Sequence, residues 1–449
     1  MPILNLNYML WDAVTASKVV GWSLPTTPAD LWPYQKIAAA AAEYKAAGFD
    51  AALFMPSTLG AAGIHSGGYD KREDYIFDGT AWGSEAMCIA AVQALHAQGI
   101  RVYGDAVFHQ MDGYPKQQYK SALFPKDPTC FAWDPGMKTS TGAPVPKLPG
   151  NVAPDSVPDP SGGWPDGDLC AYDQPNRYMW EGAIAATANQ VTTLGFDGFR
   201  IDEAKDLHAP FLVALMNSPA LKDLFFAAEY FDGNPYALGG YVNYWTGRRC
   251  SVLDFMFKFN VGVICNNNSK VWMGQLSEIG YNMIDAMKAV TFVENADSDT
   301  SIGEQTVWNK LLGYMILCTF PGEPMVYYRD WSDDPNCYDL KAGINNGLWI
   351  WRHLAQGNFV TRNAEFQTFA HERLGYGDAP GCVCFFNNDQ WHPHTVTVQT
   401  RYGNNVRLHE YTGNAGYSAD KWTNYHGQIT VTIPRNVNGC NSLVYAPYL

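Results

Sequence analysis

The chain has 449 residues, of which 47% are hydrophobic, enough to build a large core. Its formal net charge of −14 argues against binding to nucleic-acid backbones or to anionic membrane surfaces. No run approaches the roughly 18 unbroken apolar residues of a membrane span. We therefore expect neither nucleic acid nor a membrane as a partner.

Short apolar runs typical of β-strands alternate with stretches of helix length through the first 330 residues. The strands are predicted at 4–10, 50–55, 101–107, 197–202, 224–229, 252–255, 290–295 and 323–328. The helices are predicted at 35–47, 84–98, 180–194, 268–288 and 303–317. Eight strands alternating with helices predict an α/β fold of the (β/α)8 barrel type, in which the carboxyl ends of the strands form the active face.

Two segments depart from this alternation. Residues 109–178 are rich in Gly, Pro and Asp, and they predict an irregular inserted domain after the third strand. Beyond residue 360, alternating apolar and polar residues separated by turns predict a C-terminal antiparallel β-sandwich. We expect a barrel formed by 1–108 and 179–360, an inserted domain at 109–178 and a sandwich domain at 361–449.

Cysteine spacing and the first residues carry little information about compartment. The ten cysteines show no metal-type CxxC pairing, and Cys382 and Cys384 are expected on one face of a core strand. The start, MPILNLNYMLWDAV, lacks the basic region, the long apolar stretch and the cleavage site of a signal peptide.

The run GFDGFRIDEAKD places Arg200 and Asp202 two residues apart at the end of a predicted strand. Alternation along a strand puts both side chains on one face. A guanidinium beside a buried carboxylate favours the ionised form, and an ionised carboxylate can attack a sugar carbon. A structural Arg–Asp pair that closes the strand is an equally good interpretation of this run alone.

Four carboxylic acids follow predicted strands at the same end of the barrel. They are Asp105, Asp202, Glu229 and Asp297, after the third, fourth, fifth and seventh strands. A lone aspartate at a strand end is usually a turn former, but four at one face are harder to explain in that way. Crowded carboxyl groups push their pKa values apart, which provides both a nucleophile and a general acid for a glycosidic bond.

Six short segments resemble, in order and rough spacing, the motifs of the α-amylase family of glycoside hydrolases. They are DAVFHQMDG, DGDLCAYDQPN, GFRIDEAKD, AEYF, FVENADSDT and GEPMVYYRD. The resemblance covers nearly the whole chain, including the inserted and C-terminal domains. It implies a retaining mechanism in which Asp202 is the nucleophile, Glu229 the general acid/base and Asp297 the carboxylate that orients the sugar.

The resemblance also implies roles for the residues around these acids. Arg200 would keep Asp202 ionised, and Asp105 would support the site from behind. Tyr69 would stack beneath the sugar being cleaved, and Lys205 would contact the product-side sugars.

Two positions depart from the family pattern. The first motif usually ends in Asn-His, and here it reads His109-Gln110. The fourth usually reads Asn-His-Asp, and here Ala296 precedes Asp297. Gln110 can still donate a hydrogen bond to the sugar, whereas Ala296 cannot, so we expect one weaker contact in the transition state.

The calcium site of the family is expected at His109, Asp168 and the backbone carbonyl of Asp206. Asp168 supplies the carboxylate of the inserted domain, but His109 replaces an asparagine and is a poor ligand for a hard cation that prefers oxygen. Calcium therefore stays open as a cofactor.

The resemblance implies retaining, endo-type hydrolysis of α-1,4-glucosidic bonds in starch and related glucans. An enzyme that forms malto-oligosaccharides falls within this function. An α-glucan transglycosylase is the alternative within the fold. A catalytically silent glucan-binding protein is a third interpretation, against which the three intact acids argue. The resemblance implies a secreted protein with an α-glucan as its partner, and we expect a monomer.

Overall fold

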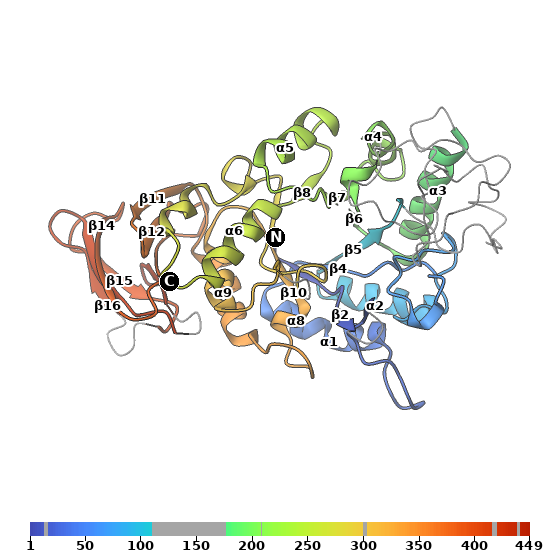
Figure 1. The fold of residues 1–449 in the computed structure, drawn as a ribbon, viewed down its shortest axis with the longest axis horizontal. Coiled ribbons are helices and arrows are strands. Elements are labelled where there is room, and N and C mark those ends of the chain that lie inside the picture. The colour runs from blue at the N-terminus through green and yellow to red at the C-terminus, as the bar shows by residue number, and fades with distance from the viewer. Residues whose placement is uncertain (13–16, 110–176, 208, 300–302, 415–419, 438–440) are drawn as a thin grey trace.

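The computed structural model describes residues 1–12, 17–109, 177–207, 209–299, 303–414, 420–437 and 441–449. Eight parallel strands close into a barrel in the order β1-β10-β9-β8-β7-β6-β5-β4 (Figure 1). Their bounds are β1 Ile3–Asn5, β4 Ala51–Leu53, β5 Arg101–Ala106, β6 Gly198–Ile201, β7 Phe225–Ala228, β8 Ser251–Leu253, β9 Ala289–Phe292 and β10 Glu323–Tyr327. All eight predicted strands are confirmed, each of them shorter than expected.

Helices follow most of the barrel strands and begin and end at recognisable signals. They are α1 Pro33–Ala47, α2 Glu85–Ala97, α3 Arg177–Leu194, α4 Ala209–Asn217, α5 Pro235–Gly240, α6 Phe255–Asn266, α7 Lys310–Thr319, α8 Tyr328–Trp331 and α9 Lys341–His353. The hydroxyl of Ser84 accepts a 3.3 Å hydrogen bond from the backbone N–H of Met87 and caps α2. Gly48 ends α1 in the left-handed conformation, with φ of 101°.

The helix expected at 268–288 is wrong. That segment contains only two short 3-10 helices, η5 Met273–Glu278 and η6 Tyr281–Met283. The helix after β8 is α6, because Asp254 caps it: its Oδ1 accepts a 3.0 Å hydrogen bond from the N–H of Phe257. The sequence interpretation had assigned Asp254 to the preceding strand.

The first predicted strand also differs from the structure. It ends at Asn5, and the chain then forms an antiparallel hairpin of β2 Met9–Asp12 and β3 Ser17–Val20. The last predicted helix begins later than expected, at Lys310 rather than at 303.

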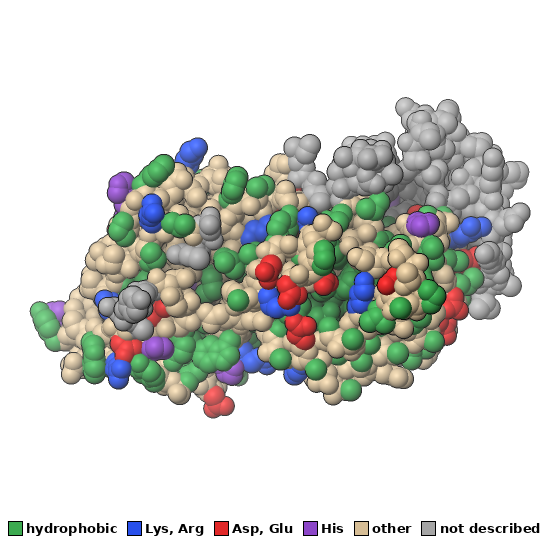
Figure 2. All heavy atoms as spheres, turned by 90° about the horizontal axis from the view of Figure 1, so that it is seen from below, with side chains coloured by type: hydrophobic (Ala, Val, Ile, Leu, Met, Phe, Trp, Pro, Cys, Tyr) green, Lys and Arg blue, Asp and Glu red, His purple; other side chains and the backbone are tan. Residues whose placement is uncertain are grey.

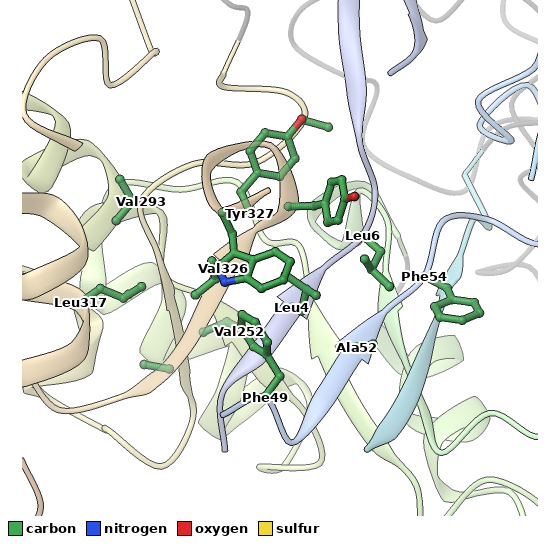
Figure 3. Packing of buried hydrophobic residues seen from close by; sticks show 14 of the residues in the cluster. Leu4, Leu6, Phe49, Ala52, Phe54, Val252, Val293, Leu317, Val326 and Tyr327 are labelled. Carbon is green, nitrogen blue, oxygen red and sulfur yellow. The ribbon is translucent and has the colours of Figure 1, made fainter. Parts of the chain in front are cut away.

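Alternating side chains of the barrel strands fill two separate cores. Ile3 packs inside the barrel with residues such as Val290 and Phe292, whereas Leu4 packs between the barrel and its helices. Figure 3 shows part of this outer layer, in which Leu4 of β1 lies beside its register partner Val326 of β10. Strands buried on both faces explain the nearly continuous apolar runs in the sequence.

The C-terminal part forms the predicted antiparallel sandwich. A six-stranded sheet has the order β11 Phe359–Ala364, β12 Thr368–Arg373, β13 Cys382–Asn387, β18 Ser442–Ala446, β15 Arg407–Glu410 and β16 Asp420–Trp422. A second sheet pairs β14 His394–Gln399 with β17 Gln428–Ile433, and a separate apolar core joins the two sheets. This unit lies at one end of the molecule, beyond α6 and α9 (Figure 1).

Almost all of the expected inserted domain, 109–178, lies outside the described residues, and the domain boundaries stay predictions. Cys382 and Cys384 are both buried with free thiols, and their sulfur atoms lie 3.5 Å apart. None of the helices within the described ranges is long and apolar enough to cross a bilayer. On the face shown in Figure 2, acidic and basic side chains lie together near the middle.

Candidate active site

The register of two neighbouring strands brings the first site residues together. Asp105 on β5 lies directly beside Arg200 on β6. Phe199 and Ile201 belong to the core outside the barrel, so Arg200 and Asp202 project inward at its mouth. The prediction that Arg200 and Asp202 share a face is confirmed.

One guanidinium, that of Arg200, contacts three carboxyl groups. Its Nη1 lies 2.8 Å from both carboxylate oxygens of Asp105 and 2.8 Å from Oδ1 of Asp202. Its Nη2 lies 2.5 Å from Oε1 of Glu229. Arg200 is only 6% exposed, so these ion pairs lie in a largely water-excluded site. The structure therefore brings the predicted nucleophile, general acid and supporting aspartate around one cation.

Backbone contacts fix the two acids at the ends of their strands. The N–H of Asp202 donates to the carbonyl of Ala106 at 3.0 Å, and the N–H of Glu229 donates to that of Ile201 at 2.9 Å. Glu203 follows Asp202 with φ of 46°, a sharp left-handed turn for a residue with a side chain. This turn points the N–H of Glu203 at Oε2 of Glu229, 3.1 Å away.

Tyr69 joins this cluster from the long segment after β4. Its hydroxyl donates to Oδ2 of Asp105 at 2.7 Å and accepts a hydrogen bond from Nδ2 of Asn7. The centre of its ring lies 5.8 Å from the guanidinium carbon of Arg200. These contacts hold Tyr69 at the mouth, and Asn7 is a residue of this cluster that the sequence interpretation missed. Its position just beyond the first strand was the available signal.

Crowding changes the acid strengths in this cluster. Burial raises the pKa of Asp202 well above its usual range, and Glu229 and Asp105 raise it further, although Arg200 lowers it. Burial likewise raises the pKa values of Glu229 and Asp105. Arg200 favours the ionised form of Asp202, but burial and the neighbouring acids oppose it, because one cation is shared by three buried acids. The raised pKa of Glu229 suits a general acid.

Asp297 enters the mouth from the loop after β9. Its backbone N–H donates to Oδ1 of Asn295 at 3.1 Å, and the N–H of Ser298 donates to the same atom at 2.9 Å. Its side chain is 59% exposed, and its carboxylate forms an ion pair with Lys18 of β3. Partial desolvation within the mouth opposes ionisation of this half-exposed side chain, but Lys18 and then Arg200 lower the pKa of Asp297 below its usual value. The sequence interpretation missed Lys18.

The two departures from the family pattern have different surroundings. Ala296 is 4% exposed and packs within the main apolar core, so it offers no polar atom to the mouth. Gln110 lies outside the described residues. Just before Ala296, Glu294 is buried beside Lys258 at 3.3 Å, and burial raises its pKa to about 6.

Lys205 spans the loops that follow Asp202 and Glu229. Its ammonium lies 3.0 Å from Oδ2 of Asp232, donates to the carbonyl of Phe231 at 3.1 Å and lies 5.6 Å from the ring centre of Tyr230. The Lys205 side chain is 42% exposed, so Lys205 is the more solvent-accessible partner of this ion pair.

Of the three residues expected to bind calcium, His109 and Asp206 lie within the described part of the chain, and His109 is a poor ligand for calcium. Nδ1 of His109 lies 3.1 Å from Oε2 of Glu203. The histidine therefore pairs with a carboxylate, and its ring offers only nitrogen to a cation that prefers oxygen. Asp206 lies on a 3-10 helix, η3 Ala204–Asp206, and Asp168 is outside the described residues. Among described side chains, no group of three or more His, Cys, Asp and Glu is arranged to hold a metal ion.

No protein-family model matches the chain. Its sequence is 25% identical over 354 residues to an α-amylase of Bacillus licheniformis, covering 67% of this chain and 66% of that enzyme. It is 29% identical over 150 residues to a glucan 1,4-alpha-maltohexaosidase of Bacillus sp. (strain 707), covering 32% of this chain and 29% of that enzyme. The matched segments thus span less than two thirds of these relatives.

Solved structures share the whole fold. An α-amylase of Geobacillus thermoleovorans, complexed with acarbose, has a TM-score of 0.68 at 16% identity, covering 99% of this chain and 97% of the other. In sequence the chain is similar to α-amylases, and in structure it shares their fold. The chain also aligns with a γ-CGTase from alkalophilic Bacillus clarkii, with a TM-score of 0.68 at 16% identity, over 92% of this chain and 64% of the other.

Proposed function

We propose that the chain hydrolyses α-1,4-glucosidic bonds in starch and related glucans, cutting within the polymer and retaining the anomeric configuration. The observation that carries the proposal is the contact of one guanidinium, Arg200, with both Asp202 and Glu229. Two acids within reach of one guanidinium fit the separation of about 5 Å that retaining glycosidases use.

In the first step, an oxygen of Asp202 forms a bond to the anomeric carbon while the bond from that carbon to the glycosidic oxygen breaks. Glu229 gives its proton to the departing oxygen. In the second step, ionised Glu229 takes a proton from water, and the water oxygen attacks the same carbon. The bond to Asp202 breaks, so both acids return to their starting states and one water is consumed.

The electrostatics of the cluster support this division of roles. Burial and Asp297 raise the pKa of Glu229, which favours the protonated form that a general acid needs. Lys18 lowers the pKa of Asp297, which favours an anion beside a transition state with positive charge on the sugar. For Asp202, Arg200 is the contact that favours ionisation against burial.

Other parts of the site support a glucan substrate. We assign Tyr69 to the floor beneath the cleaved sugar, because its ring is fixed by Asp105 and Arg200 at the mouth. We assign Lys205 to the product side, because it bridges the loops after both reacting acids. Gln110 is assigned to sugar binding on the family resemblance alone.

The proposal extends to the length of the released sugars. The similarity to a maltohexaosidase supports a malto-oligosaccharide-forming enzyme. We derive no step through calcium, because His109 contacts Glu203 and offers a cation no oxygen ligand. We propose secretion on the family resemblance, and we also propose a monomer.

Purified protein incubated with soluble starch tests this function. We expect new reducing ends, with α-anomers formed first, and products resolved by length as short malto-oligosaccharides. Glu229→Gln should abolish the release, whereas Glu43→Gln, in an ion pair on α1 far along the chain from the site, should not. Longer or cyclic glucans would favour a transglycosylase. If the wild type released no sugar, the remaining interpretation would be a glucan-binding protein without catalytic activity.

A further inference from the structure

The β2–β3 hairpin follows the first barrel strand and is anchored at its base. The indole N–H of Trp22, just after β3, donates to the carbonyl of Leu6 at 3.2 Å. The Trp22 ring stacks on Tyr328, with the ring centres 4.4 Å apart. The hydroxyl of Tyr327 donates to the carbonyl of Met9 on β2 at 3.2 Å. These contacts tie the hairpin to the ends of β1 and β10, at the mouth of the barrel.

From this anchored hairpin, Lys18 reaches the site. Its ammonium contacts Oδ1 of Asp297, a residue 279 positions later in the chain. The Lys18 side chain is 22% exposed, so most of it is removed from water. The contact involves one of the two carboxylate oxygens, which makes the two oxygens of Asp297 inequivalent.

The charge balance of the mouth shows why this contact matters. Four acids face the mouth: Asp105 on β5, Asp202 after β6, Glu229 after β7 and Asp297 after β9. Arg200 forms its ion pairs with the first three. The fourth acid, Asp297, forms an ion pair with Lys18. Arg200, Tyr69, Glu229 and Asp105 are the other titratable groups that interact with Asp297 across the mouth.

The neighbour of Asp297 cannot supply this contact. Ala296 is buried in the apolar core and has no polar side-chain atom. Asn295 holds the backbone of Asp297, and the hairpin holds its carboxylate.

We propose that Lys18 is a positioning residue of the active site, which holds the Asp297 carboxylate ionised and oriented at the mouth and so couples the β2–β3 hairpin to catalysis. The proposal rests on the proposed function, because it assigns Asp297 a role at the bound sugar. It adds a residue that lies outside every motif of the sequence.

Lys18→Met tests the proposal, since methionine keeps much of the side-chain length without the charge. We expect kcat on a malto-oligosaccharide of defined length to fall about 10- to 100-fold, the effect of losing a hydrogen bond between charged groups. KM should change less than threefold. Lys18→Arg should recover most of kcat, and Lys18→Gln, which keeps a neutral donor, should fall between the two.

A matched control is Lys45→Met, which removes an ion pair with Asp50 at 3.2 Å on the surface of α1 and should leave kcat unchanged. The pH profile separates positioning from a purely structural effect. Without Lys18 the pKa of Asp297 should rise, so the acid limb of kcat/KM should move to higher pH in Lys18→Met and return in Lys18→Arg.

A double-mutant cycle tests whether Lys18 acts through Asp297. In an Asp297→Asn background, Lys18→Met should reduce the residual kcat less than twofold. Losses that multiply independently would overturn the proposal, as would an unchanged kcat in Lys18→Met beside an active wild type. Wild type that releases no sugar from starch would instead refute the proposed function.

Discussion

Replacing Arg200 by methionine removes the cation that three buried acids share while keeping a similar volume. Asp105, Asp202 and Glu229 would then face one another without a partner, each already with a pKa raised by burial. Removing one partner of a buried ion pair costs about 3–5 kcal/mol of stability. We expect the free energy of unfolding of Arg200→Met at pH 7 to be lower than that of the wild type by this amount.

The pH dependence of this deficit follows from its cause. The pKa values of the three acids should rise further, so the folded variant binds about one more proton than folded wild type near neutral pH. Stability associated with a raised acid pKa is present at low pH and is lost as pH rises through the folded value. The deficit should therefore shrink by about 1.4 kcal/mol per pH unit, or about 3 kcal/mol between pH 7 and pH 5.

Urea unfolding of wild type and variant at pH 5, 6 and 7 measures this difference. Arg200→Lys should lie between them, because an ammonium keeps the charge but loses the fork that reaches Asp202 and Glu229 at once. Arg352→Met is the control: it breaks a 2.7 Å ion pair with Asp50 at the surface and should cost at most about 1 kcal/mol at every pH. A deficit for Arg200→Met that stays constant from pH 5 to pH 7 would refute the electrostatic explanation.

Further predictions concern stability, rate and metal. Burial raises the pKa of Asp254 to about 6. The free energy of unfolding of the wild type, relative to that of Asp254→Asn, should therefore fall by about 3 kcal/mol as pH rises from 4 to 7. Urea unfolding measures this difference, and a difference that does not change with pH would contradict the prediction. Ala296→His should raise kcat at least twofold by adding a hydrogen-bond donor beside Asp297. It should also lower the free energy of unfolding by about 1–3 kcal/mol, because the position is buried. A smaller gain in kcat would reject the expectation that Ala296 weakens a contact with the transition state. Tyr69→Phe keeps the ring but removes the hydrogen bond to Asp105, and calorimetry should show a loss of about 1–2 kcal/mol; an unchanged stability would mean that water replaces this bond. Treatment with EDTA should leave the initial rate within twofold, because His109 lies against Glu203; a loss that Ca²⁺ restores and Mg²⁺ does not would count against this expectation.

The barrel was accessible from the sequence because its strands are buried on both faces and therefore appear as short apolar runs. The same logic placed Arg200 and Asp202 on one face, since a strand repeats every two residues. The helix predicted at 268–288 failed for a local reason: Asp254 accepts a hydrogen bond from Phe257 and starts the helix earlier, on residues too apolar to be told from a strand.

The sequence by itself determined which acids end which strands, since that depends only on order along the chain. Only the tertiary structure decided how they share charge. Lateral pairing of β5 with β6, and of β6 with β7, sets three acids around Arg200 and raises the pKa of Asp202 where the isolated pair predicted the reverse. The contact of Lys18 with Asp297 likewise depends on closure of the barrel, which brings β1 beside β10 and so places the hairpin at the mouth. Charge interactions depend on distance in space, and spacing along a sequence does not contain that distance.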